Sequence, residues 1–203
     1  MSVRQRETAD ETRERIAIVA EEMFRRMGFA KTAVADIAAA LDMSAANVYR
    51  FFPSKNAIVE TICNRSLAEM EAQIAALVHA PFTAAQRIEQ VFVAILLYHR
   101  DNFLVERRVH DMVLVAIEHN WAAIEAHKDR IRHHIAVLLR EGVTEGVFVP
   151  HDVDRVSAIL LGACVRYCHP ILVAQCIDED LEAQARETVR FLLRAVEVNR
   201  RPM

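Results

Sequence analysis

The sequence predicts an all-α protein of about nine helices. Apolar residues recur at the helical period through almost the whole chain, whereas no alternating strand pattern of useful length and no repeat of about 20–50 residues is present. Hydrophobic residue types make up 53% of the 203 residues, and there are only 4 Gly and 5 Pro. This composition excludes disordered and collagen-like chains and allows one large domain or two small ones.

Four helices are expected in the first part of the chain. Apolar residues at i, i+3, i+4 and i+7 predict the first helix over Ile16–Met27, and Gly28 follows it where a helix C′ residue belongs. Two short helices come next, separated by a three-residue turn. After Pro53, Ser54 can cap a long fourth helix. The ranges expected for the last three helices are 34–40, 44–51 and 54–79.

Five more helices are expected after Pro81, which ends the fourth. Thr83 and Gln86 fit a capping box that opens the fifth helix. Asp152 is a suitable cap for the eighth helix, which Pro170 must kink or end. The other ranges expected are 103–118, 121–145 and 180–199.

Charge, apolar runs and cysteine content narrow the class of protein. The chain has 25 Lys+Arg against 28 Asp+Glu, so a protein that coats nucleic acid through overall positive charge is excluded. The apolar runs 91–98 and 158–165 are far shorter than the about 20 residues of a membrane span. No secretory signal opens the chain, and 4 Cys do not make a disulfide scaffold. These observations predict a cytoplasmic protein without a membrane partner.

The segment from Lys31 to Lys55 has the pattern of a helix-turn-helix. Val34 and Ile37 mark the buried side of its first helix, and Ser44 can cap the second through its hydroxyl. Val48, Phe51 and Phe52 can face the core. The second helix then leaves a polar and small-residue face outside, made of Ala45, Ala46, Asn47, Tyr49 and Arg50.

Such a face suits docking into the DNA major groove. Alanines let the backbone approach closely and can touch thymine methyl groups, and Asn47 can pair with adenine, which contributes about 1–3 kcal/mol of discrimination. Residues 44–56 contain basic side chains and no acidic one. The residues expected at the edges, where side chains reach phosphates, are Lys31, Thr32, Tyr49 and Lys55.

The same residues carry a resemblance to a known family. The strings T-x-V-x-D-I-A (32–38) and S-x-x-x-V-Y-x-F-F-x-S-K (44–55) resemble the TetR (tetracycline-repressor-like) family of bacterial transcriptional regulators, with specific similarity over about residues 10–65. The resemblance implies a DNA-binding head over 10–70, with its motif at about 33–52, and an effector-binding and dimerisation body over 71–203. It also implies that Ser44 to Asn47 and Arg50 face bases, while Thr32, Tyr49 and Lys55 hold phosphates.

What the resemblance implies about activity is a homodimeric, ligand-responsive repressor rather than an enzyme. Such a protein binds a palindromic double-stranded operator and is released by a small-molecule effector, with no cofactor. Two residues depart from the family pattern. Ala33 stands where Ser or Thr commonly caps a helix, so Thr32 is expected to take over the cap, and Asp42 stands at the usual turn glycine.

Aromatic and other large apolar residues in the body are candidates for the effector pocket, although core packing explains each of them as well. Those proposed are Phe92, Tyr98, Phe103, Met112, Trp121 and Tyr167. Apolar stripes on the last two long helices are candidates for the dimer interface, by analogy with the family. They comprise Val156, Ile159, Leu160, Ala163, Val189, Leu192, Leu193 and Val196.

Two alternative functions remain open. Cys164 and Cys168 are four residues apart on one predicted helix with His169 adjacent, which could sense a soft metal or oxidation. Burial of small apolar thiols on a helical face is the favoured explanation of this spacing, and no metal site is predicted. The other alternative is an all-helical enzyme or metal-binding protein without DNA binding, but no recognisable pairing of base and nucleophile is present.

Overall fold

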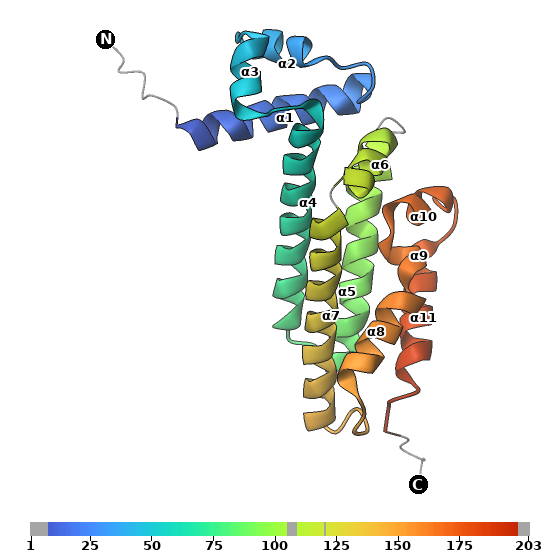
Figure 1. Ribbon diagram of the computed structural model, residues 1–203. Coiled ribbons are helices and arrows are strands. Elements are labelled where there is room, and N and C mark those ends of the chain that lie inside the picture. Colours follow the sequence, from blue (N-terminus) through green and yellow to red (C-terminus); the bar gives the residue numbers. More distant parts are fainter. Residues whose placement is uncertain (1–7, 105–108, 120, 199–203) are drawn as a thin grey trace. The chain divides into compact units, whose positions relative to one another are not determined.

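The described part of the protein is helical almost throughout. The computed structural model describes residues 8–104, 109–119 and 121–198. Within these residues it contains eleven α-helices, one π-helical turn and an isolated β-bridge between Phe148 and Glu197 (Figure 1). The predicted all-α class is confirmed. Among the described helices, none has the combination of length and apolarity that a membrane span requires.

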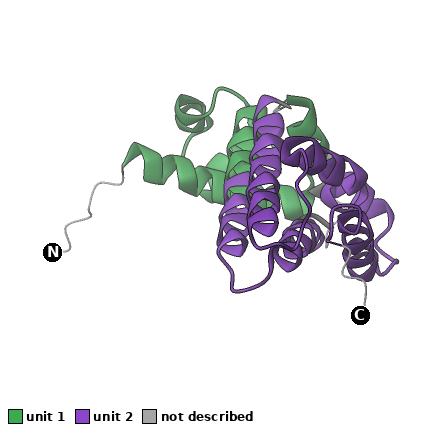
Figure 2. Ribbon diagram, turned by 90° about the horizontal axis from the view of Figure 1, so that it is seen from below, with its two compact units in different colours: residues 1–66, 106–121 green, residues 67–105, 122–203 purple. Residues whose placement is uncertain are grey.

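The chain divides into two compact units, shown in separate colours in Figure 2. Unit 1 comprises residues 1–66 and 106–121. It contains α1 (Ala9–Met27), α2 (Val34–Ala40), α3 (Ala45–Phe51), the first turns of α4 (Lys55–Val78) and α6 (Val109–His119). The fully or almost fully buried side chains at the centre of this unit are Ile16, Ala20, Phe24, Ile37, Val48, Phe52 and Ile58.

Unit 2 comprises residues 67–105 and 122–203 and is built around α5 (Ala84–His99). The helix contacts α9, α10 and α11, which explains why its sequence is apolar on more than one side. A π-helical turn, η1 (Arg100–Leu104), continues it. The other elements are the rest of α4, α7 (Trp121–Thr144), α8 (Val153–Ala163), α9 (Val165–Cys168), α10 (Pro170–Gln175) and α11 (Leu181–Leu193).

Helix starts follow the capping signals in the sequence. Ser44 accepts a hydrogen bond from the Asn47 N–H at 3.2 Å, and Thr83 and Gln86 form the predicted capping box. Asp152 accepts from the Arg155 N–H and begins α8. Because these side chains satisfy N–H groups that a helix start leaves unpaired, they fix where each helix begins.

The region from Asp152 to Pro170 differs from the single helix expected there. It divides into α8, α9 and α10, which accounts for eleven helices in place of about nine. The first break lies at Cys164, whose side chain is fully buried, and the second precedes Pro170, which occupies the first turn of α10. Proline is tolerated there because that position needs no helical N–H bond.

The last helix is shorter than the predicted range 180–199, and residue 199 lies outside the described part of the chain. α11 ends at Leu193, and the chain then turns so that Val196 packs into the core. The Val149 N–H donates to the Val196 carbonyl at 2.8 Å, and the Val198 N–H donates to that of Val147 at 3.0 Å. These two backbone hydrogen bonds replace the helical hydrogen bonds that a longer α11 would make.

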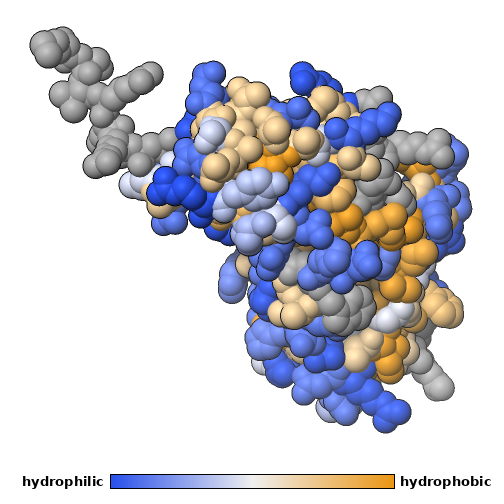
Figure 3. Space-filling view, turned by 45° about the horizontal axis from the view of Figure 1, so that its top comes forward, coloured by the Kyte–Doolittle hydropathy of each residue, from blue (hydrophilic) through white to orange (hydrophobic). Residues whose placement is uncertain are grey.

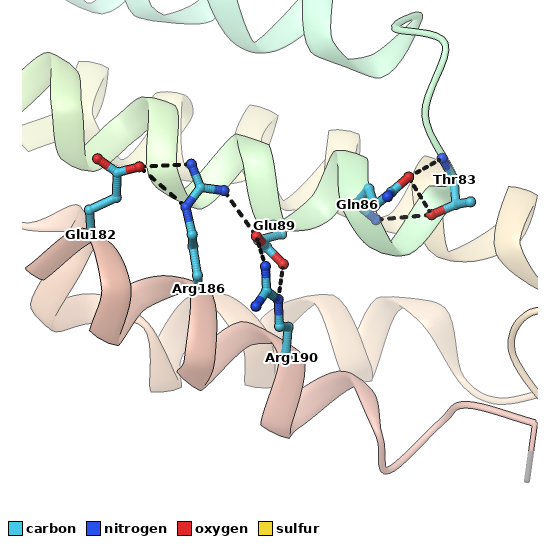
Figure 4. Close-up of polar contacts among 6 residues, drawn as sticks. All are labelled: Thr83, Gln86, Glu89, Glu182, Arg186 and Arg190. Carbon is cyan, nitrogen blue, oxygen red and sulfur yellow. Dashed lines mark hydrogen bonds and ion pairs between the residues drawn. The ribbon is translucent and has the colours of Figure 1, made fainter.

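A buried carboxylate joins α5 to α11 (Figure 4). Glu89 is 7% exposed and accepts hydrogen bonds from Arg190 at 2.6 and 2.9 Å and from Arg186 at 2.9 Å. Arg186 also binds Glu182. Burial alone would raise the pKa of Glu89, but the two guanidinium groups outweigh it and lower the pKa, so the carboxylate stays charged.

Gly142 in α7 lies against the ring of Phe148, and the sequence does not reveal this close approach. A methyl group at Gly142 would overlap the fully buried Phe148 ring and lie 3.1 Å from the Ala84 Cβ. We therefore expect Gly142→Ala to lower the free energy of unfolding by about 1–3 kcal/mol, as overpacking of a core does. Urea denaturation at pH 7 measures this change, and an unchanged free energy of unfolding would contradict it.

Candidate DNA-binding interface and regulatory body

The turn between α2 and α3 has the geometry that the sequence predicts. Asp42 has a φ of 54°, in the left-handed region that glycine usually occupies. The Met43 N–H donates to the Ala38 carbonyl at 2.9 Å, which closes the end of α2. Asp42 therefore takes the place of the usual turn glycine without breaking the motif, because Asp tolerates this conformation better than most residues.

The start of α2 differs from the expectation. Ala33 is the N-cap and has no acceptor on its side chain, and the Asp36 carboxylate accepts from the Ala33 N–H at 2.9 Å. Thr32 does not take over the cap, because its hydroxyl donates to the Gly28 carbonyl at 2.9 Å and its side chain is 1% exposed. The prediction that Thr32 holds a phosphate is wrong for the same reason.

The N-terminal part of α3 presents a surface of small and polar side chains. Val48 is fully buried and fixes which side of the helix faces the core. Asn47 is half-buried, and its amide oxygen lies 3.4 Å from the Arg50 guanidinium. Of the other residues predicted to contact DNA, Ala45 is half-buried, and the exposed ones are Ser44, Ala46, Tyr49 and Arg50, together with Lys31 in the loop between α1 and α2.

Lys55 contacts its own protein chain, in contrast to the predicted phosphate contact. Its Nζ donates to the carbonyl oxygens of Phe29 at 2.7 Å and Thr32 at 3.0 Å, and it lies 4.1 Å from the centre of the Phe29 ring. Partial burial lowers the pKa of Lys55. The ammonium is therefore directed into unit 1.

The predicted effector residues that the structure describes all belong to the core of unit 2. Phe92 is fully buried, and Tyr98 and Tyr167 are each 6% exposed. The Tyr98 hydroxyl donates to Glu69 at 3.0 Å, and the Tyr167 hydroxyl lies 3.0 Å from that of Thr188. The side chains of the other three predicted residues lie outside the described part: Phe103, Met112 and Trp121.

A cavity of about 180 Å³ lies where α5, α10 and the start of α11 meet. Its floor consists of the buried side chains of Leu96, Val173 and Leu181. Charged residues surround it, and none of the three predicted effector residues whose side chains are described (Phe92, Tyr98 and Tyr167) lines it. The remaining lining residues are Arg100, Ile177, Glu179, Asp180 and Glu182.

Cys164 and Cys168 are in environments that disfavour the reactive thiolate. Burial raises the pKa of Cys164 to about 12 and also raises that of Cys168, so both remain protonated. Within the described residues, no three His, Cys, Asp or Glu side chains are placed to hold a metal. These observations weigh against the metal- or redox-sensing alternative.

The predicted dimer residues lie on different sides of their helices. Leu160, Val189, Leu193 and Val196 are buried within unit 2, which corrects their assignment to an intermolecular interface. Val156 and Leu192 are half-buried, and only Ile159 and Ala163 are exposed.

Two exposed apolar residues, one on α9 and one on α11, were not predicted from the sequence. Val165 is 47% exposed and Phe191 is 69% exposed. Phe191 comes two residues after Val189, about 200° around α11, so the two side chains point to nearly opposite sides of the helix. An apolar stripe along one side of the helix therefore cannot include both. Figure 3 shows several groups of hydrophobic side chains at the surface on the face that it displays.

Comparison with known families identifies the chain. Residues 84–189 match the family described as "Tetracyclin repressor-like, C-terminal domain". Residues 16–62 match "Bacterial regulatory proteins, tetR family", and these residues include α2 and α3. The sequence has no significant match among curated proteins.

Solved structures share the fold over most of the chain. A TetR-family transcriptional regulator from Pectobacterium atrosepticum is 19% identical, with a TM-score of 0.73 over 98% of this chain and 100% of that chain. The TetR-family regulator PfmR of Thermus thermophilus is 26% identical, with a TM-score of 0.60 over 89% and 97%. FadR of Thermus thermophilus, a TetR-family repressor in complex with lauroyl-CoA, is 20% identical, with a TM-score of 0.63 over 94% and 98%. The chain belongs to the TetR family of bacterial transcriptional regulators.

Proposed function

We propose that this regulator binds a palindromic double-stranded DNA operator as a homodimer and represses transcription until a small-molecule effector releases it. The DNA-binding head corresponds to residues 10–70 and the effector-binding and dimerisation body to residues 71–203. The protein acts in the cytoplasm, as a regulator rather than an enzyme. The observation that carries this proposal is the exposed N-terminal surface of α3.

This surface has the chemistry of direct base readout. Ala46 is exposed and bears only a methyl group, so the backbone can approach base edges closely. Asn47 and Arg50 supply an amide and a guanidinium, which pair with adenine and guanine respectively. Tyr49 on α3 and Lys31 in the loop before α2 are exposed and can contact phosphates. No acidic side chain lies on α3 to repel the DNA.

A twofold dimer is supported by the exposed apolar residues of unit 2. Ile159 on α8, Val165 on α9 and Phe191 on α11 are 54%, 47% and 69% exposed. Gly162 and Ala163 are also exposed, and small residues let two helices approach closely. A second copy of the chain that covers these residues would remove them from water and would place two α3 helices for the two halves of a palindrome.

Release by an effector follows if the ligand binds more tightly to the conformation that does not fit the operator. FadR in complex with lauroyl-CoA supports a ligand-responsive body. The cavity beside α10 holds only about 180 Å³, less than the about 300 Å³ typical of sites for drug-sized ligands. The effector site therefore stays a prediction on the six aromatic and apolar residues named from the sequence, and the ligand stays unassigned.

Asn47→Ala tests the base-reading role of α3. Because one good pair with adenine discriminates by about 1–3 kcal/mol and the dimer loses two such pairs, we expect a loss of about 30-fold to 10⁴-fold in affinity for the preferred operator, together with a changed preference at one position in each half-site. Selection of bound fragments from genomic DNA, followed by mobility-shift assays on single-base variants, measures both effects.

Lys31→Ala is the matched control, because Lys31 is expected to contact a phosphate. This variant should weaken binding to all sequences about equally and lower the salt dependence. If Asn47→Ala keeps both the wild-type affinity and the wild-type sequence preference, α3 does not read the bases as proposed.

A further inference from the structure

Lys55 joins the first turn of α4 to the loop between α1 and α2. Its ammonium donates to two carbonyl oxygens of that loop, those of Phe29 at 2.7 Å and Thr32 at 3.0 Å. The same ammonium lies 4.1 Å from the centre of the Phe29 ring. Two of its three N–H donors are thus bonded within unit 1, at positions 23 and 26 residues earlier in the chain.

Arg13 makes a comparable contact on the other side of the α3–α4 junction. From α1 its Nη1 donates to the carbonyl oxygen of Phe51, the last residue of α3, at 2.6 Å. Its guanidinium carbon lies 4.3 Å from the centre of the buried Phe52 ring. A cation at this place satisfies a carbonyl that the end of a helix leaves unpaired and also matches the negative end of the helix dipole.

We propose that Arg13 and Lys55 are positioning residues, which set the direction of α3 by holding both sides of the α3–α4 junction and do not bind operator phosphates. This inference rests on the proposed function of α3. Arg13 holds the last residue of α3 and Lys55 holds the first residue of α4, so both ends of the three-residue connection Phe52–Ser54 are fixed.

The small size of α3 explains why such contacts are needed. The helix has 7 residues, well below the length at which an isolated helix is stable in water. Val48 and Phe52 hold one side of it in the core, but two neighbouring anchors do not fix the direction of the helix axis. Hydrogen bonds from charged groups are stronger than neutral ones and fix geometry more sharply.

Removal of either cation should leave unit 1 folded. Arg65 on α4 binds Glu14 and Glu21 on α1, so these two helices keep a separate connection within the unit. Neither substitution changes the buried apolar residues of unit 1. The variants can therefore be studied as folded proteins.

Lys55→Met and Arg13→Met test the proposal, with Lys31→Met as the matched control. For each variant of the full-length dimer, operator affinity is measured between 50 and 300 mM salt, and amide hydrogen exchange is measured in free protein. We expect both test variants to lose affinity about 100-fold or more, which corresponds to one charged hydrogen bond in each of the two chains of the dimer. The dependence of log K on log salt should stay at the wild-type slope, while the α3 amides exchange faster.

A phosphate contact gives a different result. Each lost phosphate contact lowers the slope by about 0.9, so a residue present twice in the dimer lowers it by about 1.8. This is the expected result for Lys31→Met.

The proposal is overturned for Lys55 or Arg13 if its variant shows the lower slope with wild-type exchange in α3, or if affinity and exchange both stay unchanged. A purely structural role would lower the melting temperature and leave the affinity of the folded protein unchanged, which also overturns it. If wild-type protein binds no duplex, the proposed function fails, and the exchange of the α3 amides still decides whether the two cations hold the helix.

Discussion

Phe191→Asp is expected to convert the proposed dimer into monomers. Phe191 is 69% exposed in the single chain, so the substitution should not disturb the fold of unit 2. In a twofold interface each substitution occurs twice. A buried carboxylate without a partner costs about 3–5 kcal/mol, so two copies should raise the dimer dissociation constant by about 10⁴-fold or more. Sedimentation velocity at micromolar protein concentration measures the change.

Loss of the dimer should also weaken operator binding, by about 100-fold or more, because a monomer can occupy only one half-site. Phe82→Asp is the matched control: Phe82 is 52% exposed, lies on neither α8 nor α11, and precedes Thr83 in the loop before α5. That variant should sediment as wild type does. A dimeric Phe191→Asp variant would show that the exposed apolar residues of α8, α9 and α11 are not the interface.

The helix-turn-helix could be predicted closely because its signals are local. Ser44 lies next to the helix that it caps, and Asp42 occupies the turn within four residues of the carbonyl that closes α2. These interactions depend on side-chain chemistry and on short spacings, both of which are visible in a sequence. The burial of Val48 then fixes which side of α3 faces the core, and it leaves Asn47 partly exposed.

The role of Lys55 could not be predicted in this way. Its acceptors are the backbone carbonyls of Phe29 and Thr32, and any residue type supplies such a carbonyl. Only the tertiary fold brings them to the start of α4. Thr32 illustrates the same limit, because its hydroxyl turns inward to the Gly28 carbonyl and the sequence shows only that a hydroxyl is present.

The apolar residues of the body were the least predictable part. Helical periodicity identifies an apolar stripe, but it does not distinguish a stripe that faces the core of the same chain from one that faces a second chain. In α11 the regular stripe of Val189 and Leu193 is the core side, and the interface candidate is the isolated Phe191. The cavity beside α10 was missed because three separate elements form it.

The second large effect concerns the buried histidines, which are expected to lower the free energy of unfolding in acid. His99 is 7% exposed at the end of α5, and its Nε2 lies 3.0 Å from the Cys168 carbonyl. Burial lowers the pKa of His99 to about 4, and the nearby His127 and His169 add to the effect, while the Cys168 carbonyl opposes it. Burial also lowers the pKa of His127 and His169. The folded protein therefore favours neutral imidazoles.

We expect the free energy of unfolding to fall as the pH decreases from about 6.5 to 4. In this range His99 takes up a proton in the unfolded chain, where its pKa is about 6.5, but not in the folded one, so the unfolded state gains stability. The difference between 6.5 and about 4 corresponds to about 3 kcal/mol for His99 alone. The carboxylates of Glu71 and Glu89, whose pKa values are lowered, lose their contribution only below about 4.5, so they are distinguishable from the histidines.

Urea denaturation of wild type and His99→Gln at pH 7.5, 6 and 5 measures this contribution. The glutamine keeps an amide that can donate to the Cys168 carbonyl but cannot titrate, so His99→Gln should lose less stability between pH 7.5 and 5 than wild type does. Between these two values the His99 contribution is about 2 kcal/mol, because only the part of the range above pH 5 is sampled. His119→Gln, at an exposed site on α6, should follow the wild-type dependence. Equal pH dependence in His99→Gln and wild type would show that the imidazole of His99 does not resist protonation in the folded protein.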